Sequence, residues 1–143
     1  MANNMDQLTQ MYRALSEEMR LRIIMLLTDG ELCVCDLMAV FDEGQSKVSR
    51  HLAYLKHSGL VKSRRVGTWM HYSLKERLDG PVGAQLGFME GYLSNLSVFR
   101  DDKQRMEGIK RQKLCEQTAC NSAGDRPPTG GTNCTDNEGI RNG

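Results

Sequence analysis

The apolar residues of this chain change their spacing at Ser58-Gly59, and that change limits the folds it can adopt. Over residues 46–58 they recur three and four positions apart, which is typical of one buried helix face. Over 60–65 and 69–74 apolar and polar residues alternate, which predicts two strands joined by the glycine-containing loop 66–68. The sequence therefore predicts a helix followed at once by a β-hairpin.

Helical spacing also precedes this segment. We expect a first helix through Leu8, Met11, Tyr12 and Leu15. A second is expected to be capped by Ser16 and ended by Asp29-Gly30, and a third to stop at residues 42–44. Two helices separated by a short glycine-containing turn outline a helix-turn-helix, and a hairpin directly after it makes a winged helix. The predicted fold class is mainly α with a small β-hairpin: a winged helix-turn-helix that forms a homodimer through its terminal helices.

Charge is distributed unevenly along the 143 residues. The whole chain carries +1, but residues 44–75 carry +7 with no acidic residue, so the remainder carries −6. A charge run is often only a solvated face, yet a local block of this purity favours a polyanion-binding surface. The overall near-neutrality therefore does not exclude DNA as a partner.

Two absences bound the cellular setting that we expect. No apolar run approaches the 18 residues of a transmembrane helix, and mean hydropathy is −0.51. The N-terminus shows no secretory signal, so the five cysteines are expected as reduced thiols in the cytoplasm. The prediction is a cytoplasmic protein with no membrane partner.

The start of the helix over 46–58 is the expected reader of DNA. Glutamine can pair with adenine and arginine or lysine with guanine, while a helix N-terminus suits a phosphate. The hairpin would add backbone or minor-groove contacts, whereas Trp69 and Tyr72 are expected in the core. The candidate DNA-binding residues are Gln45, Ser46, Lys47, Ser49, Arg50, His51, Arg64 and Arg65.

A further helix is expected over residues 82–99, with apolar residues spaced as in a coiled coil. It is either an ordinary core-facing helix or a dimer interface, and the small core favours the interface. The expected dimerisation residues are Leu8, Met11, Leu15, Val82, Leu86, Met89 and Leu93. We expect residues 1–99 to form the DNA-binding and dimerisation domain, 100–114 a helical extension, and 115–143 a flexible tail containing cysteines.

Cys33 and Cys35 lie two residues apart. On a regular helix their thiols would point to opposite sides, so they converge only if Cys33 is extended and Cys35 is in the first helical turn. A helix N-terminus would then favour the thiolates and enhance binding of a soft ion. On spacing alone, two small buried apolar residues are an equal alternative.

Four motifs together resemble the ArsR/SmtB family, and its arsenic-responsive ArsR branch most, over roughly residues 8–98. The motifs are Leu15-Ser16-Glu17-Glu18-Met19-Arg20-Leu21-Arg22-Ile23, Glu31-Leu32-Cys33-Val34-Cys35-Asp36-Leu37, Ser46-Lys47-Val48-Ser49-Arg50-His51-Leu52-Ala53-Tyr54-Leu55-Lys56 and Gly67-Thr68-Trp69-Met70-His71-Tyr72. The resemblance implies a dimeric repressor that leaves its operator when trivalent arsenic or antimony binds Cys33 and Cys35. It implies no cofactor for DNA binding itself.

One departure from the branch leaves the ligand set open. Met38 stands where a third cysteine often follows, so either two thiolates suffice or another thiol, from Cys115, Cys120 or Cys134, completes the site. Cys115 and Cys120 are the favoured candidates. A cadmium- or lead-responsive repressor of the same fold and a thiol redox-sensing repressor remain alternative functions. A thiol enzyme is not expected, because neither a C-x-x-C motif nor an anion-cradling loop before a cysteine is present.

Overall fold

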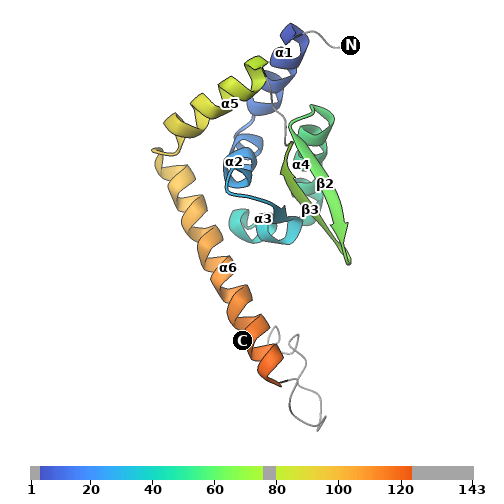
Figure 1. The fold of residues 1–143 in the computed structure, drawn as a ribbon, viewed down its shortest axis with the longest axis vertical. Coiled ribbons are helices and arrows are strands. Elements are labelled where there is room, and N and C mark those ends of the chain that lie inside the picture. Colours follow the sequence, from blue (N-terminus) through green and yellow to red (C-terminus); the bar gives the residue numbers. More distant parts are fainter. Residues whose placement is uncertain (1–3, 76–79, 124–143) are drawn as a thin grey trace. The chain divides into compact units, whose positions relative to one another are not determined.

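The computed structural model describes residues 4–75 and 80–123, with side chains described for 5–75 and 80–114. By their contacts, residues 1–106 and 107–143 form two separate units. Figure 1 shows the elements in chain order. They are α1 (Asn4–Leu15), α2 (Glu18–Leu27), β1 (Leu32–Cys33), α3 (Val34–Phe41), α4 (Gln45–His57), β2 (Val61–Val66), β3 (Trp69–Leu74), α5 (Gly80–Leu93) and α6 (Ser97–Ala123).

The core of the first unit lies between α2, α3, α4 and a three-stranded sheet. Ile23, Leu37, Leu52 and Leu55 are completely shielded from solvent there. The α3 and α4 helices pack on one another, joined by a short turn in which Asp42 ends α3 in the left-handed region at φ 52°. The expected helix-turn-helix and the hairpin after it are both present, so the winged-helix prediction is confirmed.

The sheet is antiparallel with the strand order β1-β3-β2, so β3 is its central strand. The two residues of β1, which the sequence did not predict, pair with β3 as Leu32 with Tyr72 and Cys33 with His71. On the other side of β3, Arg64 pairs with the same His71. Cys33, His71 and Arg64 therefore form one row across the three strands, and directly opposed residues lie on one face of a sheet.

The single helix expected over residues 82–99 is wrong. The structure divides this segment into α5 and α6, separated by Ser94, Asn95 and Leu96. Ser94 Oγ donates to the Gly91 carbonyl, and the Asn95 and Leu96 amides bond three residues back, which closes the helix in a tight turn. Serine and asparagine commonly compete with helix hydrogen bonding in this way.

Two smaller expectations are also wrong. Ser16 does not cap α2. Its hydroxyl donates to the Arg13 carbonyl, and Glu17 is the cap, accepting from the Arg20 amide at 3.1 Å. Trp69 is 41 % exposed because it lies at the far end of the hairpin, paired with the exposed Val66 and beyond the core. Tyr72 is buried, as expected.

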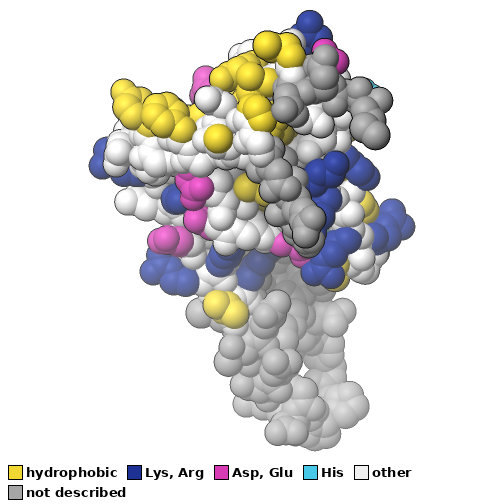
Figure 2. Space-filling view, turned by 45° about the horizontal axis from the view of Figure 1, so that its top comes forward, with side chains coloured by type: hydrophobic (Ala, Val, Ile, Leu, Met, Phe, Trp, Pro, Cys, Tyr) yellow, Lys and Arg dark blue, Asp and Glu magenta, His cyan; other side chains and the backbone are white. Residues whose placement is uncertain are grey.

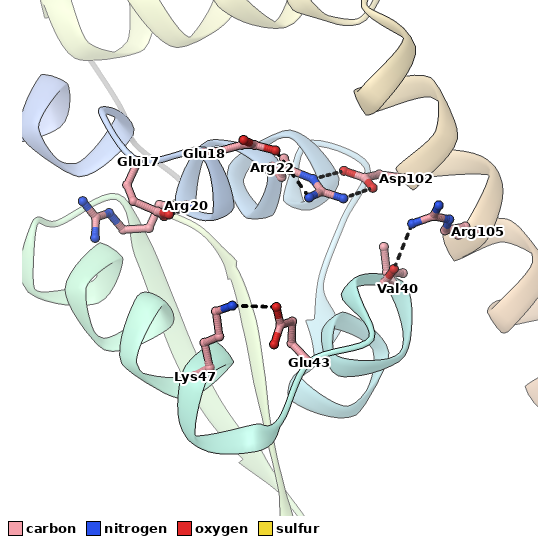
Figure 3. Close-up of polar contacts among 9 residues, drawn as sticks. All are labelled: Glu17, Glu18, Arg20, Arg22, Val40, Glu43, Lys47, Asp102 and Arg105. Carbon is pink, nitrogen blue, oxygen red and sulfur yellow. Dashed lines mark hydrogen bonds and ion pairs between the residues drawn. The ribbon is translucent and has the colours of Figure 1, made fainter.

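The start of α6 is fixed to α2 by a buried ion pair (Figure 3). Arg22 Nε and Nη2 donate to the two carboxylate oxygens of Asp102 at 2.8 and 2.7 Å. The Asp102 side chain is 2 % exposed and that of Arg22 18 %. The same hydrogen bonds raise the pKa of Arg22. Because the guanidinium and the carboxylate form a bidentate pair, the contact holds the first turns of α6 at a defined place in the first unit.

The expected boundary between the helical extension and the tail, at residues 114 and 115, lies inside α6. The tail expected from residue 115 overlaps the end of α6, and residues 124–143 lie outside the described part of the chain. Within the described residues, no helix combines the length and the apolar character needed to cross a membrane.

Candidate DNA interface and thiol site

The α4 helix presents a polar face away from the core. Val48, Leu52 and Leu55 are fully buried beneath it, which fixes the rotation of the helix about its axis. Gln45, Ser46, Lys47 and Arg50 are exposed, whereas Ser49 and His51 are partly buried. The α4 N-terminus, capped at Gly44, lies at the same end as the exposed residues. This face can therefore offer side-chain donors and free backbone amides to a polyanion.

The hairpin forms the second part of the basic surface. Arg64 and Arg65 lie on β2, and both are exposed. Gly67 takes φ 63° in the loop, a conformation that a side chain would disfavour. Figure 2 shows one group of Lys and Arg side chains along the right side of the molecule and others on its left. All eight predicted DNA-binding residues lie on α4 or β2.

Three of these predicted DNA contacts are paired with glutamates. Lys47 Nζ lies 2.6 Å from Glu43 Oε1 (Figure 3), and His51 Nδ1 lies 3.5 Å from Glu17 Oε2. Arg64 makes two hydrogen bonds to Glu31, from Nε at 2.8 Å and from Nη2 at 2.6 Å. The Glu43–Lys47 pair joins residues only four apart. The Glu17–His51 and Glu31–Arg64 pairs join distant parts of the sequence, so they follow from the fold.

The Glu31 carboxylate has a second neighbour. His71 Nδ1 lies 3.4 Å from Glu31 Oε1, so one carboxylate touches side chains of both hairpin strands. The hydrogen bond from Arg64 lowers the pKa of the Glu31 carboxyl and raises the pKa of Arg64. Arg50 and Arg65 form no ion pair with any residue that the structure describes. They are consequently the basic candidates most directly available to DNA.

Cys33 and Cys35 meet at the boundary between β1 and α3. Cys33 is extended (φ −73°, ψ 150°) and is the N-cap of α3, whereas Cys35 lies in the first helical turn. This is the placement that the sequence predicted for convergence. The Cα atoms are 5.1 Å apart, and the two sulfur atoms are joined as a disulfide. The spacing is within the usual range for bridged cysteines, so both sulfurs can reach one small bound group.

The helix N-terminus holds the thiol segment in a capping box. Cys33 Sγ accepts from the Cys35 amide at 3.3 Å, and the Asp36 carboxylate accepts from the Cys33 amide at 3.0 Å. Cys33 is 4 % exposed, whereas Cys35 is partly exposed. A ligand would therefore approach from the Cys35 side, at the positive end of the helix, where thiolates are favoured.

The structure describes no side chain of the other three cysteines. The side chains of Cys115 and Cys120 on α6, and all of Cys134, lie outside the described residues. Among the side chains that the structure does describe, no group of three or more His, Cys, Asp or Glu could hold a metal ion.

Known proteins are similar to this chain in sequence and in fold. The model of the bacterial regulatory protein arsR family matches residues 17–63. The arsenic resistance transcriptional regulator ArsR2 of Pseudomonas putida is 44 % identical over 110 residues, which are 76 % of this chain and 94 % of that protein. The chain belongs to the arsR family. This confirms the resemblance and indicates a regulatory protein, not an enzyme.

Other relatives of this arsR-family chain agree with that assignment. The arsenical resistance operon repressor of Escherichia coli is 49 % identical over 70 residues, which span 48 % of this chain and only 60 % of the repressor. HlyU from Vibrio cholerae superposes with a TM-score of 0.56 at 31 % identity, covering 65 % of this chain and 99 % of HlyU. Mb0332 from Mycobacterium bovis is a homodimeric winged helix-turn-helix DNA-binding domain. It has a TM-score of 0.52 at 27 % identity, covering 65 % of this chain and 87 % of Mb0332.

The predicted dimerisation residues of this arsR-family chain mostly face its own core. Met11, Leu15 and Val82 are buried within the protomer, while Leu8, Leu86, Met89 and Leu93 are partly buried. Leu86 and Met89 line a cavity of about 280 Å³ together with Ile24 and Met25 of α2.

Sequence reasoning missed the apolar side chains that are exposed on α1 and α5. Phe88 and Tyr92 are 70 % and 68 % exposed, and their rings stack with centroids 6.3 Å apart. Met5 and Tyr12 on α1 are 67 % and 50 % exposed. Figure 2 shows hydrophobic side chains gathered at the end of the molecule where Figure 1 places these two helices. The i, i+4 spacing of Phe88 and Tyr92 in the sequence was the available signal for their contact.

Proposed function

We propose that this chain is a transcriptional repressor that binds operator DNA as a dimer and is released when trivalent arsenic or antimony binds Cys33 and Cys35. The observation that carries the proposal is the convergence of the two sulfurs at the start of α3, the helix that packs on α4. The names of the relatives, arsenic resistance regulators and arsenical resistance repressors, support arsenic as the inducer.

Binding of arsenite would use the reduced pair. As(OH)₃ exchanges two hydroxyl groups for two sulfurs, and the two thiol protons leave with them as two water molecules. Because Cys33 Sγ accepts the Cys35 amide hydrogen bond, binding at this sulfur acts directly on the N-cap of α3. Linkage then requires arsenite to bind the DNA-free form more tightly, by a coupling of typically about 1–3 kcal/mol, or roughly 5- to 150-fold.

The decisive experiment follows the release of DNA by fluorescence anisotropy. A labelled duplex, selected from a random pool by the wild-type protein, is titrated with arsenite, antimonite, cadmium, lead and zinc under reducing conditions. We expect arsenite and antimonite to release it, and the Cys33→Ser, Cys35→Ser double variant to remain bound. Full release of the double variant by arsenite would refute the proposal. A weaker response in Cys115→Ser, Cys120→Ser or Cys134→Ser would assign that residue as a further ligand.

We further propose that residues 1–99 dimerise through α1 and α5. The exposed Phe88 and Tyr92 would contact the partner, while the predicted residues Leu8, Met11, Leu15, Val82, Leu86, Met89 and Leu93 support them from beneath. Two α4 helices would then address half-sites about one DNA turn apart. In analytical ultracentrifugation, the Phe88→Ala, Tyr92→Ala double variant is expected to sediment as a monomer. The control Val66→Ala, which changes an exposed apolar residue on β2, is expected to sediment as a dimer. A dimer of unchanged affinity in the first variant would exclude this interface.

Redox sensing is a second candidate, favoured by the disulfide that joins Cys33 and Cys35. Hydrogen peroxide would oxidise the two thiols to this disulfide and be reduced to two molecules of water. Release of DNA by peroxide but not by arsenite would assign the thiols to redox sensing.

A further inference from the structure

The strongest contact on the DNA-binding surface belongs to the thiol segment. Glu31 holds Arg64 through both carboxylate oxygens, at 2.6 and 2.8 Å, and bidentate pairs of this kind are the stronger ones. A DNA phosphate would use the same guanidinium edge. Arg64 therefore cannot make its best contact with Glu31 and with a phosphate at the same time.

The position of Glu31 ties this competition to the cysteines. It directly precedes β1 and is two residues from Cys33. The short β1 strand pairs with β3 at His71, which is itself opposite Arg64, and the Glu31 carboxylate lies 3.4 Å from His71. The segment that carries the thiols is thus attached to the hairpin by backbone pairing and by a side chain.

We infer that Glu31 is an internal competitor of DNA for Arg64, and that it transmits the state of the thiol pair to the hairpin. The transmission rests on the proposed function, because it assumes that arsenite binding releases DNA. A ligand bridging Cys33 and Cys35 restricts the segment before α3, so Glu31 loses less conformational entropy when it holds Arg64. The ligand-bound protein then withholds Arg64 from DNA more effectively.

The other acidic partners provide a matched control. Glu43 pairs with Lys47 at 2.6 Å, but it belongs to the turn between α3 and α4, and among the described residues it forms no hydrogen bond or ion pair with β1. Glu43→Gln removes the same charge from the same surface. It should strengthen DNA binding in the way Glu31→Gln does, while leaving the response to arsenite as in the wild type.

The first measurement is DNA affinity without arsenite, using the full chain and the selected duplex. Exposed ion pairs contribute about 0.2–1 kcal/mol, and a bidentate pair such as this one is expected in the upper part of that range. An energy of about 0.4–1 kcal/mol corresponds to binding that is about 2- to 5-fold tighter per protomer in Glu31→Gln. This gain must depend on Arg64: in an Arg64→Ala background, Glu31→Gln should change affinity by less than about 1.5-fold. An equal gain in both backgrounds would show a general charge effect and overturn the competition.

The second measurement is the ratio of DNA affinities without and with arsenite. We expect this ratio to fall at least about 2-fold in Glu31→Gln relative to the wild type, and to be unchanged in Glu43→Gln. If arsenite releases the wild type and the ratio in Glu31→Gln is also unchanged, the transmission by Glu31 is overturned. If arsenite does not release the wild type, the proposed function fails instead, and the first measurement still decides the competition for Arg64.

Discussion

Replacing Asp102 by alanine should be among the most damaging single changes on α6. Asp102 is 1 % exposed overall and accepts both hydrogen bonds from Arg22, so its removal leaves a largely buried guanidinium without its main partner. The neighbouring Asp101 is exposed and provides a matched control. Asp101→Ala removes the same group one position away, at the solvent-facing side of the same helix turn.

The expected loss follows from the surroundings of Arg22. Removing one partner of a buried pair costs roughly 3–5 kcal/mol, because it strands the other charge. Here the stranded charge is partly relieved: the Arg22 side chain is 18 % exposed, Glu18 Oε1 lies 3.6 Å from Nη1, and the guanidinium lies 4.9 Å from the Phe41 ring centre. We therefore expect a loss of about 3 kcal/mol for Asp102→Ala, and under about 0.5 kcal/mol for Asp101→Ala.

Urea unfolding at one fixed protein concentration measures both values, since association also affects apparent stability. With a slope of roughly 1–3 kcal/mol/M, a loss of 3 kcal/mol lowers the midpoint by about 1–3 M. The Arg22→Ala and double variants complete the cycle, and the double variant should be less destabilised than the sum of the two single variants. A loss below about 1 kcal/mol in Asp102→Ala, or strict additivity in the cycle, would refute the role assigned to this pair.

Three further predictions concern the helix-turn-helix and the sheet. Leu52→Ala should lower the free energy of unfolding, measured in urea, by about 2–5 kcal/mol, because Leu52 is fully buried. Arg50→Ala, on the exposed side of α4, should change this free energy by less than about 0.5 kcal/mol. The Arg50 variant should instead weaken DNA binding, measured by fluorescence anisotropy. Asp42→Gly should raise the melting temperature slightly, because glycine relieves about 0.5–1 kcal/mol of backbone strain at φ 52°. A melting temperature below that of the wild type would contradict the strain at this position. Burial raises the pKa of Tyr72, so its contribution to stability is complete below the unfolded pKa near 10 and is lost as pH rises through the folded value. When phenolate absorbance is followed as the pH rises, one tyrosine should ionise at a higher pH than the others, and Tyr72→Phe should lack this component. The variant should also retain more of its free energy of unfolding at high pH.

The sequence predicted the elements whose pattern is local. The spacing of Val48, Leu52 and Leu55 defined the buried face of α4, and the alternation on either side of Gly67 defined the hairpin. The convergence of Cys33 and Cys35 was also predictable, because only one backbone arrangement brings alternate residues together at a helix start. These features depend on residues close together in the chain.

Features that depend on distant residues were missed. The β1 strand has only two residues and exists through its pairing with β3, so no periodicity could reveal it. The pairing of Glu31 with Arg64 joins positions 33 residues apart, and the pairing of Arg22 with Asp102 joins positions 80 apart. The apolar stripe on α5 was visible, but its spacing could not show that Leu86 and Met89 face α2 while Phe88 and Tyr92 stay exposed.

The central place of β3 has a consequence for how such a regulator can be redesigned. Because His71 is opposite Cys33 on one side and Arg64 on the other, a shift of β3 by one residue would turn its side chains to the opposite faces and break both alignments together. The hairpin loop beyond Val66 and Trp69 carries no such alignment. Loops of different length or charge can therefore be exchanged there, while the inner half of the hairpin must be kept in register with Cys33.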